Sequence, residues 1–421
     1  MRKYNFLDIF SGAGGLLEGF MESGYFHPLA SVEWELSPIL TLRNRLLNKW
    51  NIQNAEDSCI WFDMQRTDEL FKGFNDKKYG KSKGLDYFAE NKTDVIIGGP
   101  PCQAYSQAGR TKDQYRMKFD YRNYLFEYYL KTIDRYQPEL FVFENVPGML
   151  SAMPDGTPIV DLIKSDVERF GYEIVDNIKE HALIDISDFN VPQKRKRVIL
   201  VGLRKGSKTY EETQSLLVKF YEEILPKYKT NKKVSVEEAI GDLQPIYPLD
   251  DDIILPVIGK QSHTLASYDP SWGHVARFQN KRDIEIFGML AKDIENKEYK
   301  FQNANSLNEI YNKATGGNSN VHKYHVLRKN QPSTTITAHL HKDGLRFIHY
   351  DPKQKRTITV REAARLQSFP DDFEFLSTRG NQYKMIGNAV PPEFSRRLSL
   401  AIKEFLDENL NSAQLELKLN L

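Results

Sequence analysis

A cysteine with a reactive setting follows one of the apolar segments of this chain. Cys102 lies in GGPPCQAYSQAGR (98–110), just after the apolar run DVIIGG (94–99). A thiolate nucleophile needs a partly exposed position near positive charge. Basic residues follow in the same loop at Arg110, Lys112, Arg116 and Lys118. Cys59, in EDSCIW, lacks this setting and is expected to be an ordinary thiol. Considered alone, Cys102 could equally be a structural cysteine.

Two further segments offer an acid and a group of cations. Glu144 follows the apolar run LFVF within FENVPGML (143–150). A carboxyl group on the rim of a hydrophobic sheet can carry a proton near neutral pH, although a capping or surface glutamate would look the same. From Gln193 to Lys208 the chain has seven basic residues and no acidic one. Because this run leads into an apolar segment, we expect its arginines to clamp a carboxylate, a carbonyl oxygen or a phosphate.

A glycine turn marks a third candidate site. FSGAGG (10–15) follows the apolar run NFLDIF and precedes a helical pattern, so its backbone could approach a ligand closely. Glu33 ends the next apolar run, where acidic residues hold ribose hydroxyls in nucleotide-type sites. The glycine spacing is shorter than GxGxxG, and no lysine follows as in a P-loop. A ligand with adenosine but no polyphosphate fits better, and a plain strand-to-helix turn is the alternative.

These candidate residues stand at the ends of apolar segments that alternate with helical patterns, which is how a βαβ chain reads. Strands are expected at 5–10, 28–34, 94–101, 139–146 and 197–203, and helices at 16–23 and from Ser37. The near-continuous hydrophobicity of the later strands is typical of a sheet covered on both faces. Open sheets of this kind carry their chemistry at the carboxyl ends of the strands, so we expect the candidate residues to share one edge.

The composition describes a globular chain and excludes several classes. The 421 residues are 40% hydrophobic and 27% charged, and 58 basic against 57 acidic residues leave a net charge of +1. Two cysteines cannot build a disulfide framework or a cysteine zinc site, and the close histidines of HLH (339–341) lack ligand partners, so no metal site is expected. No secretory signal opens the sequence, and its apolar runs are far shorter than the roughly 20 residues of a membrane span. A cytoplasmic protein is expected.

Changes in sequence character along the chain predict three segments. Residues 1–205 form the first block of α/β sequence. Residues 206–345 begin Lys/Glu-rich, continue mixed, and are expected to form a smaller inserted domain. Residues 346–421 return to apolar order and are expected to complete the first block. In this last segment IGNAVPP (386–392) precedes a helix that should dock against the sheet.

Taken in order, these motifs resemble the DNA (cytosine-5)-methyltransferase family over roughly the first 205 and last 65 residues. The matching motifs are Pro101–Gln103, Glu144–Val146, Gln193–Arg197, 360–373 and Gly387–Pro392. The resemblance implies an α/β fold with a Rossmann-like sheet of the S-adenosylmethionine-dependent methyltransferase type and helices on both faces. It also implies that residues 206–345 form a target-recognition domain.

The resemblance assigns catalytic roles. Cys102 would add to C6 of cytosine and make C5 nucleophilic, and Glu144 would hydrogen-bond N3 and the exocyclic amine. Arg197 would hold the base O2, and Arg195 would orient Glu144 or a phosphate. Because the C6 face of a stacked cytosine is inaccessible, the nucleotide must be turned out of the duplex. The implied DNA contacts are Gln103, Ser106 and Arg110.

The resemblance also assigns a site for S-adenosylmethionine. The residues implied to line or close it are Phe10, Ser11, Gly12, Gly14, Gly15, Pro101, Leu125, Asn388 and Val390. Glu33 would bind the ribose, and Trp34 would cover the adenine. Asp63, in WFDMQ, is the choice for the adenine amine, with Asp57 as a competing candidate.

Three alternatives are weighed against this interpretation. A tRNA cytosine-5 methyltransferase of the same fold would carry a CFT signature, which this sequence lacks. A catalytically inactive DNA-binding relative should have lost Cys102 or Glu144. An oxidoreductase would need a hydride-transfer constellation that is not recognisable here. The expected partners are double-stranded DNA and a cognate restriction endonuclease, with no membrane, and a monomer would suffice.

Overall fold

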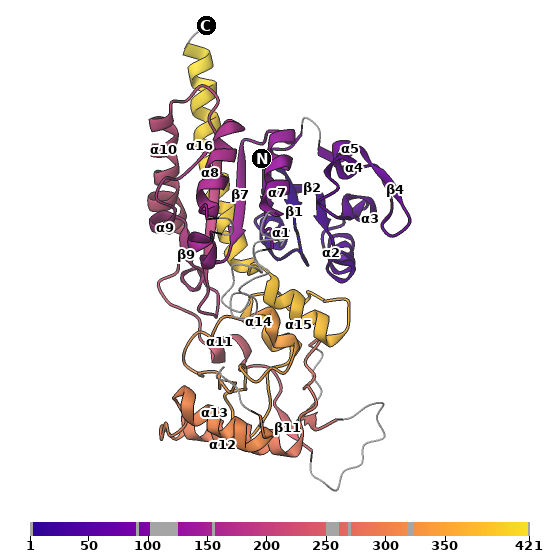
Figure 1. Cartoon of the computed structure of the whole chain (residues 1–421), viewed down its shortest axis with the longest axis vertical. Helices are drawn as coiled ribbons and strands as arrows, with labels where there is room; N and C mark the ends of the chain where they lie inside the picture. Colours follow the sequence, from indigo (N-terminus) through magenta and orange to yellow (C-terminus); the bar gives the residue numbers. More distant parts are fainter. Residues whose placement is uncertain are drawn as a thin grey trace. The chain divides into compact units, whose positions relative to one another are not determined.

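The computed structural model describes residues 3–89, 92–101, 125–153, 156–249, 261–267, 271–317 and 323–419. The chain divides into two compact units (Figure 1). The sheet unit comprises Met1–Asn190, Arg195–Asn231 and Val390–Leu421. The second unit comprises Val191–Lys194 and Lys232–Ala389.

The sheet unit is built on one mostly parallel sheet. Its strands are β1 (Tyr4–Ile9), β2 (Phe26–Glu33), β3 (Cys59–Trp61), β6 (Val95–Gly98), β7 (Leu140–Asn145), β8 (Tyr172–Ile174), β9 (Leu183–Asp185) and β10 (Lys196–Arg204). Their order is β3-β2-β1-β6-β7-β10-β8, with β9 also paired to β10. The five strands from β3 to β7 are parallel, whereas β10 runs antiparallel to its neighbours. The five strands expected from the sequence are confirmed.

The strand order places a topological switch point between β1 and β6. From β1 the chain moves outward through β2 to β3, and it then returns to add β6 and β7 on the other side of β1. Ligands of open α/β sheets bind outside the carboxyl ends of the strands at such a point. Here those ends lead into the glycine turn after β1 and into Gly99–Pro101 after β6.

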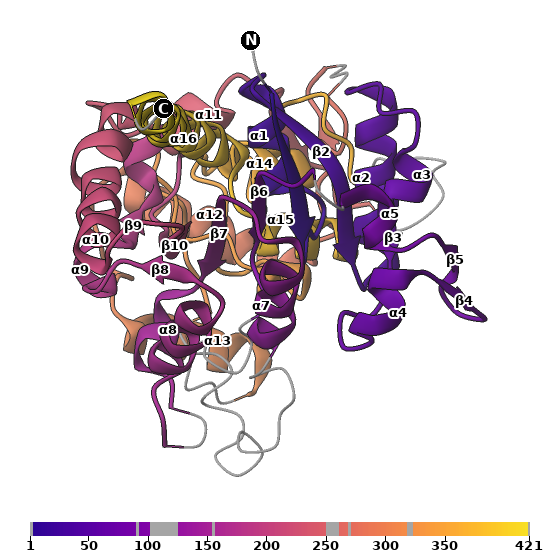
Figure 2. The ribbon, with the colours of Figure 1, turned by 90° about the horizontal axis from the view of Figure 1, so that it is seen from above.

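Helices cover both faces of the sheet, as expected (Figure 2). Phe6 of β1 packs on Phe20 of α1 (Gly15–Glu22), with ring centroids 5.5 Å apart. Gly98 of β6 points to the opposite face, because a Cβ there would lie 2.9 Å from the ring of Tyr129 in α7 (Leu125–Tyr136). The Tyr129 hydroxyl donates to the carbonyls of Ile96 and Val142 and so binds α7 across two strands.

The C-terminal helix α16 (Pro392–Leu419) docks on the sheet unit, as the sequence predicted. It approaches α1 so closely that a Cβ on Gly19 would lie 2.3 Å from the Arg396 nitrogen. The Ser395 hydroxyl donates to the Leu16 carbonyl, and the Tyr4 hydroxyl donates to Asp407 over 2.6 Å. Glycine at position 19 is therefore a packing requirement.

The sheet unit contains further short elements. They are α2 (Leu36–Asn48), α3 (Ala55–Ser58), α4 (Thr67–Lys72), β4 (Phe74–Asp76), β5 (Gly80–Ser82), α5 (Leu85–Ala89), η3 (Pro147–Ser151), α8 (Ile159–Arg169), α9 (Ile178–His181), η4 (Ile186–Phe189), α10 (Tyr210–Lys219), η5 (Phe220–Ile224) and η6 (Leu225–Tyr228). The helix expected from Ser37 is confirmed as α2, and its residues Ile39, Leu42 and Leu46 are buried. No described helix is both long and apolar enough to cross a bilayer.

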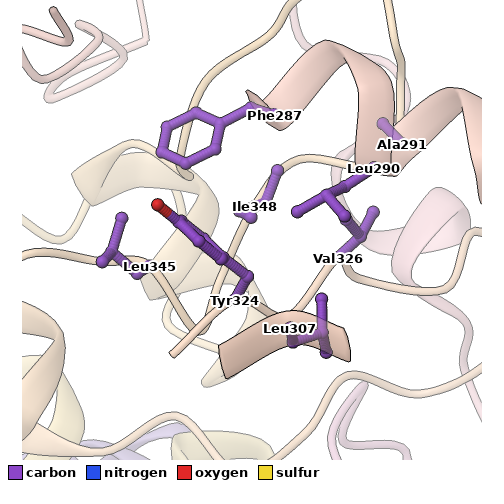
Figure 3. Packing of buried hydrophobic residues seen from close by; sticks show 8 residues of the cluster. All are labelled: Phe287, Leu290, Ala291, Leu307, Tyr324, Val326, Leu345 and Ile348. Atoms are coloured by element: carbon purple, nitrogen blue, oxygen red, sulfur yellow. The ribbon is translucent and has the colours of Figure 1, made fainter. Parts of the chain in front are cut away.

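The second unit is mainly helical. Its elements are α11 (Val236–Ile240), β11 (Ile246–Pro248), β12 (His263–Leu265), α12 (Lys281–Glu295), α13 (Ala304–Thr315), η7 (Ala338–His341), α14 (Val360–Leu366) and α15 (Arg379–Asn388). A hydrophobic cluster joins α12 and α13 to the chain around Tyr324 and Ile348 (Figure 3). A second centre is polar: the fully buried Arg356 pairs with Glu362 at 2.7 Å through both terminal nitrogens.

The two units differ in their bounds from the segments expected at 206–345 and 346–421. Residues 206–231 stay with the sheet unit, since α10 packs on β8 and Lys227 pairs with Glu404 of α16 over 2.5 Å. At the other end the second unit continues to Ala389. There a Cβ on Gly387 of α15 would lie 2.2 Å from the backbone of η7. A Lys/Glu-rich composition indicates an exposed surface, which does not by itself mark a domain boundary.

Candidate active site

Glu144 and Arg197 meet at the carboxyl end of β7. Glu144 lies opposite Ile199 of β10, and Arg197, two residues earlier on that strand, points to the same face. Arg197 Nε is 2.8 Å from Glu144 Oε1, and the two side chains are only 12% and 13% exposed. The sheet therefore brings together an acid and a cation that lie 53 residues apart in sequence.

Arg195 brings a second positive charge to this region. It is 2% exposed, and its pKa is lowered well below the usual value by burial and by the charge of Arg197. Burial lowers the pKa of Arg197 as well, while Glu144 acts in the opposite direction. Two buried guanidinium groups beside one carboxylate favour the approach of a further anion or carbonyl oxygen. The resemblance assigned Arg197 to the base, and in this structure Arg197 contacts Glu144 directly.

The chain that leads to Cys102 lies against the end of β7. A Cβ on Gly99 would be only 2.8 Å from Glu144 Oε2, so glycine allows this close approach. The Asn145 side-chain amide donates to the Pro100 carbonyl over 3.5 Å, and its oxygen accepts from Val146 N over 2.7 Å. Pro101 is half-buried. Cys102, Gln103, Ser106 and Arg110 lie outside the described residues.

Glu33 organises the glycine turn at the neighbouring strand ends. Its carboxylate accepts backbone N–H groups from Gly12 at 2.9 Å, from Trp34 at 2.9 Å and from Glu35 at 2.8 Å. Burial raises the pKa of Glu33 to about 7, against the lowering effect of these hydrogen bonds. Ser11 N donates to the Val32 carbonyl over 3.1 Å, which fixes the turn to β2. The structure thus brings Glu33 and the turn together.

The turn itself has unusual backbone geometry. Phe10, Gly12 and Gly14 have φ values of 61°, 54° and 87°. Glycine adopts this region freely, whereas a non-glycine residue there is strained and such strain is concentrated at functional sites. A Cβ on Gly14 would also lie 2.5 Å from the Leu42 side chain. Position 14 therefore requires glycine because of its φ and because the Leu42 side chain of α2 leaves no room for a Cβ. Gly15 is the first residue of α1.

Asp63, rather than Asp57, shares the edge with Glu33. Trp61 of β3 lies level with Glu33 of β2, and Asp63 follows Trp61 by two residues, directly after this parallel strand. Asp57 lies in α3, before β3 begins, and so at the opposite end of that strand. The Asp63 carboxylate accepts Gln65 N over 3.0 Å. The geometry supports Asp63 among the two candidates.

The remaining cofactor candidates belong to different elements of the chain. Leu125 is buried at the start of α7, and Val390 is buried where the chain re-enters the sheet unit. Asn388 is exposed at the end of α15 and belongs to the second unit. Among the described residues, no group of three or more His, Cys, Asp or Glu side chains could hold a metal ion.

The residues around Glu33 fit an adenosine-bearing ligand. The Trp34 side chain is 46% exposed beside Glu33, although tryptophan is large and apolar. A carboxylate can accept about four hydrogen bonds, so the three backbone contacts leave Glu33 capacity for a ribose hydroxyl. An exposed indole face and an acceptor at a strand end are the groups that an adenine and a ribose require.

Sequence reasoning missed Asp8, which lies on β1 two residues before the turn. Asp8 is 1% exposed, and neither carboxyl oxygen has a hydrogen-bond partner within the described ranges. Its pKa is raised well above the usual value by burial and by the charge of Glu33. Its in-register neighbour on β2 is Ser31, which is also buried. An aspartate inside the apolar run NFLDIF was the signal that could have identified it.

Nearly the whole chain is similar to known proteins. The family model for C-5 cytosine-specific DNA methylases matches residues 4–404. The type II methyltransferase M.Bpa9945I of Bacillus paralicheniformis is 32% identical over 95% of this chain and 99% of its own length. M.DdeI of Desulfomicrobium norvegicum is 30% identical over 97% of this chain and 90% of its own length.

Solved structures share the fold. A putative DNA modification methyltransferase from an Escherichia coli prophage aligns over 96% of this chain and all of its own, with a TM-score of 0.60 and 21% identity. The Dnmt2 methyltransferase of Schizosaccharomyces pombe aligns over 96% of this chain and 99% of its own, with a TM-score of 0.54 and 15% identity. These neighbours share the fold of this chain, a mostly parallel α/β sheet with helices on both faces. The match over nearly the whole chain and the similarity to type II methyltransferases show that this chain is a DNA (cytosine-5)-methyltransferase and belongs to the C-5 cytosine-specific DNA methylase family.

Proposed function

We propose that this chain methylates C5 of a cytosine turned out of a specific duplex DNA sequence, through a covalent bond between Cys102 Sγ and C6. The observation that carries the proposal is the Glu144–Arg197 pair, with the Gly99–Pro101 chain packed against it. Cys102 is the next residue of that chain. The chain that continues into the proposed nucleophile is therefore held, at Gly99 and Pro100, against the strand that carries the proposed acid.

Each of these residues has a role in the proposed reaction. The Cys102 thiolate forms the Sγ–C6 bond, and the electron pair of the C5=C6 double bond moves toward C5. Glu144 hydrogen-bonds N3 and the exocyclic amine and so stabilises the adduct. Arg197 holds Glu144 Oε1, which leaves Oε2, on the side of Gly99, for the base. C5 would take the methyl group from the sulfonium of the cofactor, which would leave as a neutral thioether. Water or another base would accept the C5 proton, and the electron pair of the C5–H bond would restore the C5=C6 double bond as the Sγ–C6 bond breaks, which releases methylated cytosine and the thiolate.

The proposed cofactor is S-adenosylmethionine, whose bound sulfonium supplies the methyl group as an electrophile. Glu33 would hold the ribose, Trp34 would cover the adenine and Asp63 would accept from the adenine amine. The turn from Phe10 to Gly15 would approach the remainder of the cofactor through its backbone. Gly12, where a Cβ would meet nothing within 4 Å, allows that approach without a side chain in the way.

The second unit is the proposed target-recognition domain. A cytosine inside a duplex offers no access to C6, so the reaction requires base flipping and contacts that select the sequence. The type II names of the relatives also suggest a restriction-modification system. We propose a cognate endonuclease as partner and a monomer as the working form.

Bisulfite sequencing tests this function. DNA from cells that express the chain should contain protected cytosines at one recurring sequence. DNA from cells that express the Cys102→Ser variant should contain none. Protected cytosines that are absent with the wild-type chain, or equally frequent with the variant, would contradict the proposal.

A further inference from the structure

A fully buried glutamine, Gln193, lies just before β10. Gln193 has no exposed surface, although glutamine is usually exposed. Its side-chain nitrogen donates to the Leu366 carbonyl over 2.9 Å and to the Gln367 side-chain oxygen. Its own oxygen accepts Ile336 N over 3.1 Å. This side chain therefore makes contacts in the interior of the second unit, although the surrounding motif is basic.

Gln367 extends the contact to a third segment. It is also fully buried, and its side-chain nitrogen donates to the Ile386 carbonyl over 2.5 Å and to the Ala389 carbonyl over 3.2 Å. Its oxygen accepts from Gln193. The two side chains form a continuous path from Ile336 N to the carbonyls of Ile386 and Ala389 at the C-terminal end of α15. We call this pair the glutamine relay (Gln193 and Gln367). Each amide in such a chain polarises the next.

The relay is supported by backbone pairing around Gln193. Lys194 N donates to the Ser333 carbonyl over 2.8 Å, and Ser333 N donates to the Pro192 carbonyl over 2.9 Å. The Thr335 hydroxyl donates to the Lys194 carbonyl over 2.6 Å. The four residues Val191–Lys194 are thereby incorporated into the second unit, although the chain on either side belongs to the sheet unit.

Both ends of the relay lie next to proposed site residues in the sequence. Gln193 precedes Arg195 by two residues and Arg197 by four. The relay's other end, at Ala389, stands between Asn388 and Val390. The relay thus connects the chain that carries Arg195 and Arg197, beside Glu144, with the chain proposed to close the cofactor site.

We propose that Gln193 and Gln367 are positioning residues that make cofactor affinity and the chemical step depend on one pair of buried amides. The inference rests on the proposed function, because that function defines the two ends. Loss of one amide removes a buried hydrogen bond from the other and leaves the backbone groups that it contacted without that partner, and we expect the segments leading to Arg195 and to Val390 to shift. A residue that supported only folding would change neither property while the protein stays folded.

The first test uses methionine, which is similar to glutamine in length but makes no comparable hydrogen bonds. Gln193→Met and Gln367→Met should each weaken the binding of S-adenosylhomocysteine, measured by calorimetry, by about 10-fold. Each should also slow single-turnover methyl transfer by about 10-fold. Because both residues act in one relay, the double variant should resemble the single ones and should not multiply their effects.

Leu290→Ala is the matched control. Leu290 is buried in the hydrophobic cluster of the second unit shown in Figure 3, and its loss should lower thermal stability. Its binding constant and single-turnover rate, measured well below the unfolding temperature, should stay within twofold of wild type. The proposal is overturned if Leu290→Ala changes both quantities as the glutamine variants do, or if the glutamine variants leave both unchanged.

A second variant gives a pH-dependent signature, provided that circular dichroism shows the variant to be folded at each pH. In Gln367→Glu the carboxylate present at high pH faces two carbonyl oxygens and has no hydrogen to donate to them. At low pH the protonated carboxyl group again has a donor. Its binding of S-adenosylhomocysteine, relative to wild type at the same pH, should recover as the pH falls from 8 to 5.5. A constant ratio would refute the donor role of Gln367. Wild-type protein that fails to bind S-adenosylhomocysteine or to methylate DNA would instead contradict the proposed function.

Discussion

The close approach of Gly99 to Glu144 gives a graded test of Glu144. In Gly99→Ala the new Cβ would lie 2.8 Å from Glu144 Oε2, whereas ordinary contact begins at 3.4 Å. The carboxylate must therefore move by about 0.6 Å, and it cannot move freely because Arg197 holds its other oxygen at 2.8 Å. A misplacement of about 1 Å costs about 100-fold in rate, so we expect single-turnover methyl transfer to slow about 10- to 100-fold.

Gly380→Ala is the control for this substitution. A Cβ on Gly380, within α15, meets nothing within 4 Å, so alanine should raise stability by about 0.5–1 kcal/mol and leave the rate unchanged. Rates are measured by transfer of a labelled methyl group under single-turnover conditions, and folding is checked by thermal unfolding. A Gly99→Ala protein that folds normally and transfers methyl at the wild-type rate would refute the role given to Glu144.

Three further predictions concern single side chains. The folded-state pKa of Glu33, about 7, lies above its unfolded value of 4.5, so the folded state binds the extra proton and stability falls as pH rises through this window. In Glu33→Gln the free energy of unfolding, measured by denaturant titration, should change less with pH, by up to about 3 kcal/mol across this window. The variant should also bind S-adenosylhomocysteine more weakly. An unchanged pH dependence of the free energy of unfolding would refute the prediction. Burial raises the pKa of Cys59 to about 12, so native protein at pH 8 should keep Cys59 free of iodoacetamide adducts by mass spectrometry, and rapid alkylation would contradict its burial. Cys102→Ser should bind S-adenosylhomocysteine normally and transfer no methyl, whereas an active serine variant would exclude Cys102 as nucleophile.

The longer strands could be predicted from the sequence because both faces of each are covered. β1, β2, β6, β7 and β10 were all expected within a few residues of their observed bounds. The strands β3, β8 and β9 are three residues long, which is too short for an apolar pattern to distinguish them from loops. Their place depends on pairing with distant neighbours.

The site could be predicted where a residue stands directly at a strand end. Glu33 and Glu144 follow apolar runs, so their position indicated their edge. Gln193 lay in a recognised motif, but its burial depends on contacts with Leu366 and Gln367, more than 170 residues away. Local sequence holds no signal for such contacts.

The division into units depended on long-range packing as well. The close contacts of Gly19 with α16 and of Gly387 with η7 determine which segments pack together. Nothing in the local composition distinguishes these glycines from ordinary turn glycines. The boundaries at 231 and 389 therefore required the structure.

Mechanism-based trapping tests the central claim most directly. A duplex with 5-fluorocytosine at the target position carries fluorine in place of the C5 proton, so the Sγ–C6 bond cannot break after methyl transfer. Incubation with S-adenosylmethionine should leave protein and DNA covalently joined, and mass spectrometry of the digested complex should locate the bond on Cys102. An active enzyme that yields no such complex, or a complex joined through another residue, would contradict the account.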